Sequence, residues 1–183
     1  MEYIPTAING VFICNPKVFS DDRGYFMETW READFNAAAG YDVHFVQDNE
    51  SKSHRGVLRG LHYQRGACSQ AKLVRVLQGC VVDVAVDLRK SSSTFGQYVM
   101  VELSAENKRQ LFIPRGFAHG FQVLSDEAVF TYKVDNRYAP EAECSIRYDD
   151  QTIGIDWPLQ HDLELSEKDL KHAVSFDEAE KFD

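Results

Sequence analysis

The stretch GCVVDVAVDLR, residues 79–89, places an apolar side chain at every second position. Its even positions from 82 to 88 are all apolar, whereas Asp83 and Asp87 are among the odd positions. A period of two residues is typical of a β-strand, because successive side chains of a strand point to opposite faces. The stretch therefore predicts a strand with one apolar face.

Short strands of the same kind are expected on both sides of this stretch. They lie at residues 72–77, 97–103, 110–114, 120–124 and 128–134. Turn-forming residues such as RKSSST, 89–94, separate them, and many short strands at close spacing indicate an antiparallel sandwich or barrel. Helices are expected at 29–40, which ends at Gly40, and at 165–173, which begins near Ser166. The predicted fold class is therefore mainly β.

The composition indicates one folded domain with an acidic surface. A chain of 183 residues is the size of a single domain, so we expect one over residues 1–183. Residues 171–183 are expected to form a peripheral tail whose acidic end, 177–183, frays. The net charge of -9 argues against nonspecific nucleic-acid binding, although it leaves room for a locally cationic pocket that binds a small anion.

The N-terminal residues and the cysteines indicate the cellular compartment of the protein. The segment MEYIPTAING, 1–10, has neither a basic start nor a long apolar run, so no signal peptide or membrane span is predicted. The four cysteines are far apart and form no CxxC pair, which gives no indication of a zinc or redox centre. We therefore expect a cytoplasmic protein with reduced thiols.

The segment PRGFAH, 114–119, has the pattern P-x-G-x-x-H and resembles the second signature of the cupin jelly roll, a small double-sheet β-barrel. Many cupins use this histidine as a metal ligand, together with two histidines of an H-x-H run. The corresponding run here is His62-Tyr63-Gln64, and the next acidic residue is the distant Asp83. Glutamine is a poor ligand for transition metals. The barrel is thus predicted without a metal site, although the short motif alone also fits a turn followed by a core histidine.

Eight ordered segments extend the resemblance over most of the chain. They are DDRGYFMETW (21–30), QDNESKS (47–53), GVLRGLHYQ (56–64), AKLVRVLQG (71–79), VDVAVDLRKSSSTFGQ (82–97), PRGFAHGFQVLSDEA (114–128), YAPEAE (138–143) and GIDWPL (154–159). Together they closely resemble the dTDP-4-dehydrorhamnose 3,5-epimerase family from about residue 9 to about residue 171. Three features depart from the family pattern: the loop 65–70 lacks a proline, Arg115 stands where proline is common, and Tyr148 stands where tryptophan is common. None of these positions is assigned to chemistry.

The resemblance implies a cupin-like epimerase that acts on a dTDP-4-keto-6-deoxyhexose, needs neither metal nor redox cofactor, and forms a homodimer. In such a substrate the protons at C3 and C5 are both adjacent to the ketone, so each can be removed to leave an enolate. Inversion then requires a base, a group that stabilises the enolate oxygen, and an acid on the opposite face of the ring.

Four residues are candidates for this chemistry. His62 suits the base, because an imidazole is an effective proton acceptor near neutral pH. The resemblance pairs His62 with Asp169, places Lys72 at the C4 oxygen and makes Tyr132 the acid. The residues alone also fit plainer roles: Ser166 and Asp169 match a helix cap, Lys72 a strand-end lysine, and Tyr132 a core tyrosine with a bonded hydroxyl.

Ten further residues match family positions that contact the nucleotide sugar. They are Arg23, Glu28, Gln47, Asp48, Asn49, Arg59, His119, Tyr138, Glu143 and Lys168. Arg23 and Arg59 suit a diphosphate because a guanidinium can bond two oxygens at once, and Tyr138 matches the residue that stacks on thymine. Each residue taken singly also fits a solvated surface side chain. The resemblance leaves open whether Arg23 and Glu28 serve their own cavity or that of a partner subunit.

The stretch RGVLRGLHYQ, 55–64, raises a question of register. In a regular strand Arg59 and His62 would point to opposite faces, yet both are needed in one pocket. Gly60 lies between them and can adopt backbone angles that are closed to other residues. We therefore expect a bulge, a bend or a strand start at Gly60.

Three other functions stay open at this stage. The first is a related epimerase that acts at one carbon only, which pocket shape rather than sequence would distinguish. The second is a metal-dependent cupin oxygenase, which tightly bound iron or manganese would indicate. The third is a cupin-like sugar-binding module, which would exchange no substrate protons with D2O.

Overall fold

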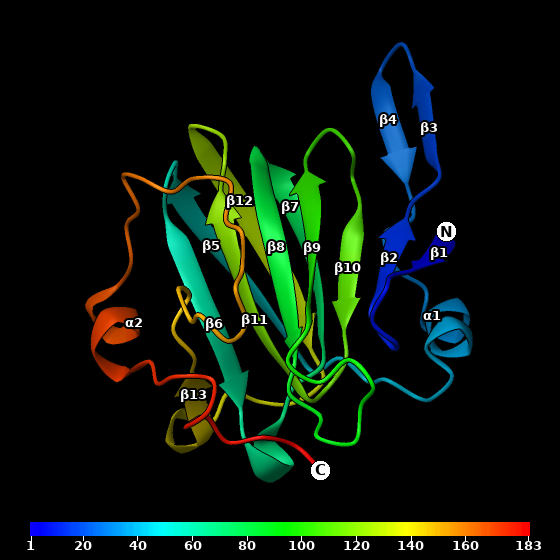
Figure 1. Cartoon of the computed structure of the whole chain (residues 1–183). Coiled ribbons are helices and arrows are strands. Elements are labelled where there is room, and N and C mark those ends of the chain that lie inside the picture. The colour runs from blue at the N-terminus through cyan, green and yellow to red at the C-terminus, as the bar shows by residue number, and fades with distance from the viewer.

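The computed structural model describes residues 1–183, which form two facing antiparallel β-sheets (Figure 1). The larger sheet has the order β1 (Glu2–Pro5), β2 (Phe12–Asn15), β10 (Gln110–Ile113), β7 (Lys72–Gln78), β12 (Glu127–Val134) and β5 (Gln47–His54). The smaller sheet has the order β13 (Glu143–Ser145), β6 (Leu58–Gln64), β11 (Phe117–Val123), β8 (Cys80–Asp87) and β9 (Tyr98–Ser104). This arrangement is the mainly β, cupin-like jelly roll that the sequence predicts.

Both predicted helices are confirmed. Helix α1 (Glu32–Ala39) ends at Gly40, whose φ of 80° allows the left-handed conformation that closes the helix. Helix α2 (Glu167–His172) begins after Ser166, whose hydroxyl accepts a hydrogen bond from the backbone N–H of Asp169. Two short 3-10 segments, η1 (Gly66–Cys68) and η2 (Pro140–Ala142), complete the helical structure. No helix has the length and apolar character needed to cross a membrane.

A hairpin of β3 (Val18–Asp21) and β4 (Gly24–Met27) stands outside both sheets and projects away from the barrel (Figure 1). Its side chains include three exposed aromatic residues: Phe19, Tyr25 and Phe26. Exposed apolar residues gathered on one element are unusual on the surface of an isolated domain.

The six predicted strands are present, and the strands that the sequence missed have a physical explanation. Strand β5 reads QDNESKSH and contains no apolar residue, so it lacks the alternation on which the prediction depends. Its odd-numbered side chains are the less exposed ones, and Ser51 among them lines a polar cavity instead of packing in the core. Strand β11 begins at Phe117, earlier than expected, so that His119 lies within the strand. The strands β1, β2 and β13 are only three or four residues long, too short for alternation to show, and they pair with β2, β10 and β6, respectively.

The two faces of β8 pack in different environments. Its even-numbered residues lie on the outer side of the smaller sheet, where Val84 belongs to the same apolar cluster as Trp157 and Phe176. Its odd-numbered residues face the interior between the sheets, where Ala85 packs in one cluster with Phe130 of β12. The strongly apolar face of β8 is therefore covered by the C-terminal part of the chain, and the face that carries Asp83 lines the barrel.

The C-terminal residues lie at the periphery, but the expected fraying of residues 177–183 is wrong. Phe176 and Ala179 are buried. The backbone N–H of Lys90 donates to the carbonyl of Phe182 over 2.8 Å, and the N–H of Phe182 donates to Leu88 over 3.0 Å. The acidic composition suggested a loose end, whereas the apolar residues spaced within it cover the outer face of the smaller sheet.

Candidate active site

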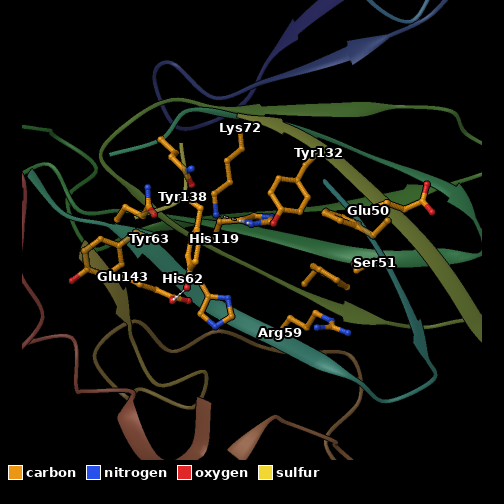
Figure 2. A pocket seen from close by; sticks show the side chains of 14 residues that line it. Glu50, Ser51, Arg59, His62, Tyr63, Lys72, His119, Tyr132, Tyr138 and Glu143 are labelled. Carbon is orange, nitrogen blue, oxygen red and sulfur yellow. Dashed lines mark hydrogen bonds between the residues drawn. The ribbon is translucent and has the colours of Figure 1, made fainter. Parts of the chain in front are cut away.

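A cavity of about 210 Å³ opens between the two sheets (Figure 2). Its wall is formed by Glu50, Ser51, Arg59, His62, Tyr63, Gln64, Gln70, Lys72, His119, Phe121, Phe130, Tyr132, Tyr138 and Glu143. Seven of these were predicted as site residues: His62, Lys72, Tyr132, Arg59, His119, Tyr138 and Glu143. Figure 2 shows them converging on one space, with Lys72 and Tyr132 on strands of the larger sheet and His62 and Arg59 on β6 of the smaller one.

Strand β6 reaches this cavity twice because its register slips at Gly60, as predicted. Arg59 pairs with Phe121 of β11 and His62 pairs with His119, so between these pairs two residues of β6 oppose one of β11. Gly60 has a φ of 128°, and a Cβ atom there would lie only 2.5 Å from the Cα of Gly120. Only glycine suits this position, and the resulting bulge brings the guanidinium and the imidazole to the same face.

His62 is hydrogen-bonded to Asp169 of α2. The distance between His62 Nε2 and Asp169 Oδ1 is 2.5 Å, and the Asp169 side chain is only 4% exposed against 30% for His62. Burial alone would raise the pKa of Asp169, but the hydrogen bond and charge of His62 bring it below its usual value. The Ser166 hydroxyl accepts the backbone N–H of Asp169 while the carboxylate of Asp169 binds His62. The helix cap and the histidine–aspartate pair are thus both present and are not alternatives.

Lys72 and Tyr132 lie in the cavity on neighbouring strands β7 and β12. Burial lowers the pKa of Lys72 to about 8, although the carboxylates of Asp83 and Glu143 oppose this change. Burial raises the pKa of Tyr132 despite the opposing charge of Arg59, so its phenol keeps its proton at neutral pH. The cavity therefore combines an ammonium that can stabilise negative charge with a phenol that can donate a proton.

A second group of predicted residues surrounds Glu143 at the mouth of the cavity. Its carboxylate accepts hydrogen bonds from the Tyr138 hydroxyl, at 2.5 Å, and from the Lys168 ammonium. Burial raises the pKa of Glu143, but these two bonds outweigh it and keep the carboxyl ionised. The Tyr138 side chain is 52% exposed, so its ring has a face available for stacking. Arg59 Nε donates to the hydroxyl of buried Ser53 over 3.1 Å, which orients the guanidinium.

The three predicted residues of β5, Gln47, Asp48 and Asn49, lie on two different faces of the strand. The Gln47 amide donates to Asn49 Oδ1 over 2.8 Å, and its oxygen accepts from the backbone N–H of Tyr138 over 3.4 Å. Both therefore lie on the cavity side of the strand. Asp48 points to the opposite face, where it pairs with Lys133 over 3.0 Å, so the structure does not bring it into the cavity.

Arg23 and Glu28 also lie away from the cavity of their own chain. Arg23 sits at the tip of the β3–β4 hairpin and pairs with Asp21, and its side chain is 89% exposed. Glu28 follows β4 and pairs with Arg31 over 2.6 Å. Their position on a projecting hairpin explains why a single chain does not join them to the other predicted residues.

Sequence reasoning missed Gln64 as a supporting residue. Its buried amide donates to the carbonyl of Cys68 over 2.7 Å and of Arg137 over 3.2 Å, and its oxygen accepts from the N–H of Ala139 over 2.7 Å. These bonds tie the segment around Tyr138 to strand β6. The sequence feature that could have identified Gln64 is its place in the H-x-H run, where it replaces the second histidine. The chain contains no group of three or more His, Cys, Asp or Glu side chains placed to hold a metal ion.

An imidazole fixed by a carboxylate, opposite a phenol and beside a buried ammonium, is suited to moving protons on a bound substrate. On a cupin-like barrel this arrangement defines an acid–base enzyme of the isomerase class. The family model for dTDP-4-dehydrorhamnose 3,5-epimerase matches residues 5–177. The chain therefore belongs to the dTDP-4-dehydrorhamnose 3,5-epimerase family.

Relatives and solved structures agree with this assignment. The chain is 58% identical over 170 residues to dTDP-4-dehydrorhamnose 3,5-epimerase of Shigella flexneri, covering 93% of each protein. It matches the crystal structure of that enzyme from Elizabethkingia anophelis NUHP1 with a TM-score of 0.93 and 53% identity, over 97% of each chain. It also matches a Legionella pneumophila 3,5-epimerase in complex with dTDP-4-keto-L-rhamnose, with a TM-score of 0.91 and 51% identity, over 94% of this chain and 92% of the other.

Proposed function

We propose that this chain inverts C3 and C5 of dTDP-4-dehydro-6-deoxy-D-glucose to give dTDP-4-dehydro-L-rhamnose, in dTDP-L-rhamnose biosynthesis. The observation that carries the proposal is the His62–Asp169 pair, which opens into the same cavity as Lys72 and Tyr132. The ligand in the Legionella pneumophila structure, dTDP-4-keto-L-rhamnose, is the product of this chemistry and supports the proposal.

The proposed mechanism assigns one step to each group. Because a carboxylate only accepts hydrogen bonds, the proton between His62 and Asp169 is on Nε2 of His62, which leaves Nδ1 as the base. His62 removes a proton next to the ketone, and the Lys72 ammonium stabilises the enolate oxygen at C4. Tyr132 then returns a proton from the other side of the ring. Both carbons flank the same ketone, so one base and one acid serve both inversions, once His62 has released its proton to solvent and Tyr132 has regained one.

The proposed binding residues lie around this centre. Arg59 is assigned to the diphosphate, and Tyr138 to stacking on the thymine. Glu143 holds the Tyr138 hydroxyl and the Lys168 ammonium, while Gln47 holds the backbone of Tyr138. His119, Asn49 and Asp48 remain proposed substrate contacts, and Asp48 would have to act from the outer face of β5.

Exchange of substrate protons with D2O tests the proposed function, read by NMR at C3 and C5. Wild-type protein should exchange and invert at both carbons; inversion at one carbon alone would favour a single-site epimerase, and no exchange a binding module. The variant His62→Ala should bind dTDP but lose exchange by roughly 10²–10⁴-fold, the usual contribution of a general base. His44→Ala is the matched control, because His44 is 72% exposed and pairs with Glu32 outside the cavity.

We also propose a homodimer in which Arg23 and Glu28 act at the partner's cavity. The support is the projecting hairpin, where Phe19 is 53%, Tyr25 59% and Phe26 71% exposed. Mixed dimers of a His62→Ala chain and an Arg23→Ala chain test the arrangement. If Arg23 acts across the interface, one of the two sites in each mixed dimer is intact and activity returns. If the mixture is as inactive as its components, Arg23 does not act at the partner's cavity.

A cytoplasmic location is proposed from the cysteine chemistry. All four cysteines, Cys14, Cys68, Cys80 and Cys144, are free thiols, as is usual in a reducing compartment. Fractionation of cells that express the full chain would test this location.

A further inference from the structure

Asp83 is a fully buried carboxylate that the mechanism above does not use. It lies on β8 with an exposed fraction of 0%, and its Oδ1 is 2.9 Å from Nε2 of buried His119. Its other oxygen, Oδ2, is buried without a hydrogen-bond partner. An unpaired buried oxygen is costly, and an apolar side chain would suit this strand better for stability alone. Its position behind His119, which lines the cavity, indicates a task there.

Asp83 and Lys72 contact opposite nitrogens of the same imidazole. Lys72 Nζ lies 3.5 Å from His119 Nδ1, on the other side of the ring from Asp83. A charged lysine only donates hydrogen bonds and an ionised carboxylate only accepts them. Both contacts are favourable together when the proton of His119 is on Nε2 and the Nδ1 lone pair faces the ammonium. The opposite tautomer would place a lone pair against the carboxylate and an N–H against the ammonium.

We propose that Asp83 is a positioning residue, which fixes His119 in the Nε2–H tautomer so that Nδ1 holds the Lys72 ammonium, still charged, where the enolate oxygen forms. This inference rests on the proposed function, in which Lys72 stabilises that oxygen. It gives His119, which the family resemblance assigns to substrate contact, a further task of orienting Lys72. Asp83 itself does not line the cavity and acts through His119, which does.

The charges around the three residues support this arrangement. Lys72 faces the carboxylates of Asp83 and Glu143, which favour its charged form against the effect of burial. Burial lowers the pKa of His119, and Lys72 and His62 lower it further, so that the imidazole is neutral despite Asp83. Burial raises the pKa of Asp83 above its usual value, and the opposing effects of His119 and Lys72 only reduce this change. The proposal takes Asp83 as ionised because it faces the Lys72 ammonium, and a charged lysine, a neutral histidine and an ionised aspartate leave the buried cluster with no net charge.

The tautomer can be measured directly on the wild-type protein without substrate. Long-range ¹H–¹⁵N NMR distinguishes the two neutral tautomers and the imidazolium, and a His119→Gln variant identifies the resonances of His119. The proposal expects the Nε2–H tautomer at pH 7 to 8. The Nδ1–H tautomer or an imidazolium would overturn it. This measurement does not depend on the substrate, so its outcome is separate from that of the D2O exchange assay.

The variant Asp83→Asn tests the effect on Lys72, because it keeps the shape of the side chain but removes the charge. The kcat for exchange should fall roughly tenfold or more, short of the 10²–10³-fold cost of deleting an oxyanion donor. The alkaline limb of the pH profile of kcat should move to lower pH, while the Kd for dTDP stays unchanged. Asp87→Asn is the matched control, because Asp87 is equally buried on β8 but pairs with Arg89. A limb that stays at the wild-type pH in Asp83→Asn would overturn the proposal, since loss of fold stability alone does not move it.

Discussion

Replacing Lys72 by methionine should separate the stability of this protein from its activity. Lys72 is half-buried on β7 with its ammonium in the cavity, and burial lowers its pKa from 10.5 to about 8. At about 1.36 kcal/mol per pKa unit, this change corresponds to about 3 kcal/mol by which folding disfavours the charged form. The value is an upper bound, because part of the side chain still meets solvent.

The sign of the pH dependence follows from proton binding. Between pH 8 and 10.5 the unfolded chain keeps the Lys72 proton while the folded protein has released it. The unfolded state therefore binds more protons, and the stability of the wild type rises with pH over this window. Lys72→Met has no such group, so the free energy of unfolding of the wild type should rise relative to the variant by up to about 3 kcal/mol. Titrating groups that do not interact with Lys72 act equally on both proteins and cancel in the difference.

Urea unfolding of both proteins at several pH values between 8 and 10.5 measures this difference. Lys133→Met is the matched control, because Lys133 lies on the neighbouring strand β12 but pairs with Asp48 on the outer face. In parallel, Lys72→Met should lose exchange activity by roughly 10²–10³-fold, as expected when an oxyanion donor is deleted. A stability difference that is constant across the window would show that the Lys72 ammonium is not desolvated, and the reasoning about its role would fail.

Three further substitutions test the remaining parts of the site. Tyr132→Phe should retain proton exchange while net inversion falls sharply, since the base survives and the acid is lost; equal loss of both would assign Tyr132 to packing or to the base. Tyr138→Ala should weaken dTDP binding by roughly 1–3 kcal/mol, the usual contribution of a base–aromatic stack, and an unchanged Kd would remove it from the nucleotide site. Gln64→Leu should leave the carbonyls of Cys68 and Arg137 unpaired and loosen the Tyr138 segment, with a loss of roughly 1–3 kcal/mol in the free energy of unfolding. An unchanged urea midpoint and dTDP affinity in Gln64→Leu would show that these bonds do not hold the segment.

Local patterns in the sequence were sufficient for six strands and both helices and, together with the family resemblance, for the bulge. Alternation identified β8, the Gly40 position marked the end of α1, and the three-residue spacing of Arg59 and His62 required the irregularity found at Gly60. Each of these features depends on backbone geometry and on side chains a few residues apart, which a sequence displays directly. The ordered motifs likewise identified the family, because they extend over most of the chain.

Local patterns did not reveal which face of a strand lies inside the barrel, and only the family resemblance indicated which distant residues meet. The apolar face of β8 lies outside, under the C-terminal segment, and the face with Asp83 points into the interior between the sheets. Strand β5 has no apolar pattern because one side faces this polar cavity. His62 and Asp169 are 107 residues apart, and only the packing of α2 against β6 brings them within hydrogen-bonding distance. Alternation shows that side chains share a face but not what covers it, because that depends on how segments far apart in the chain pack together.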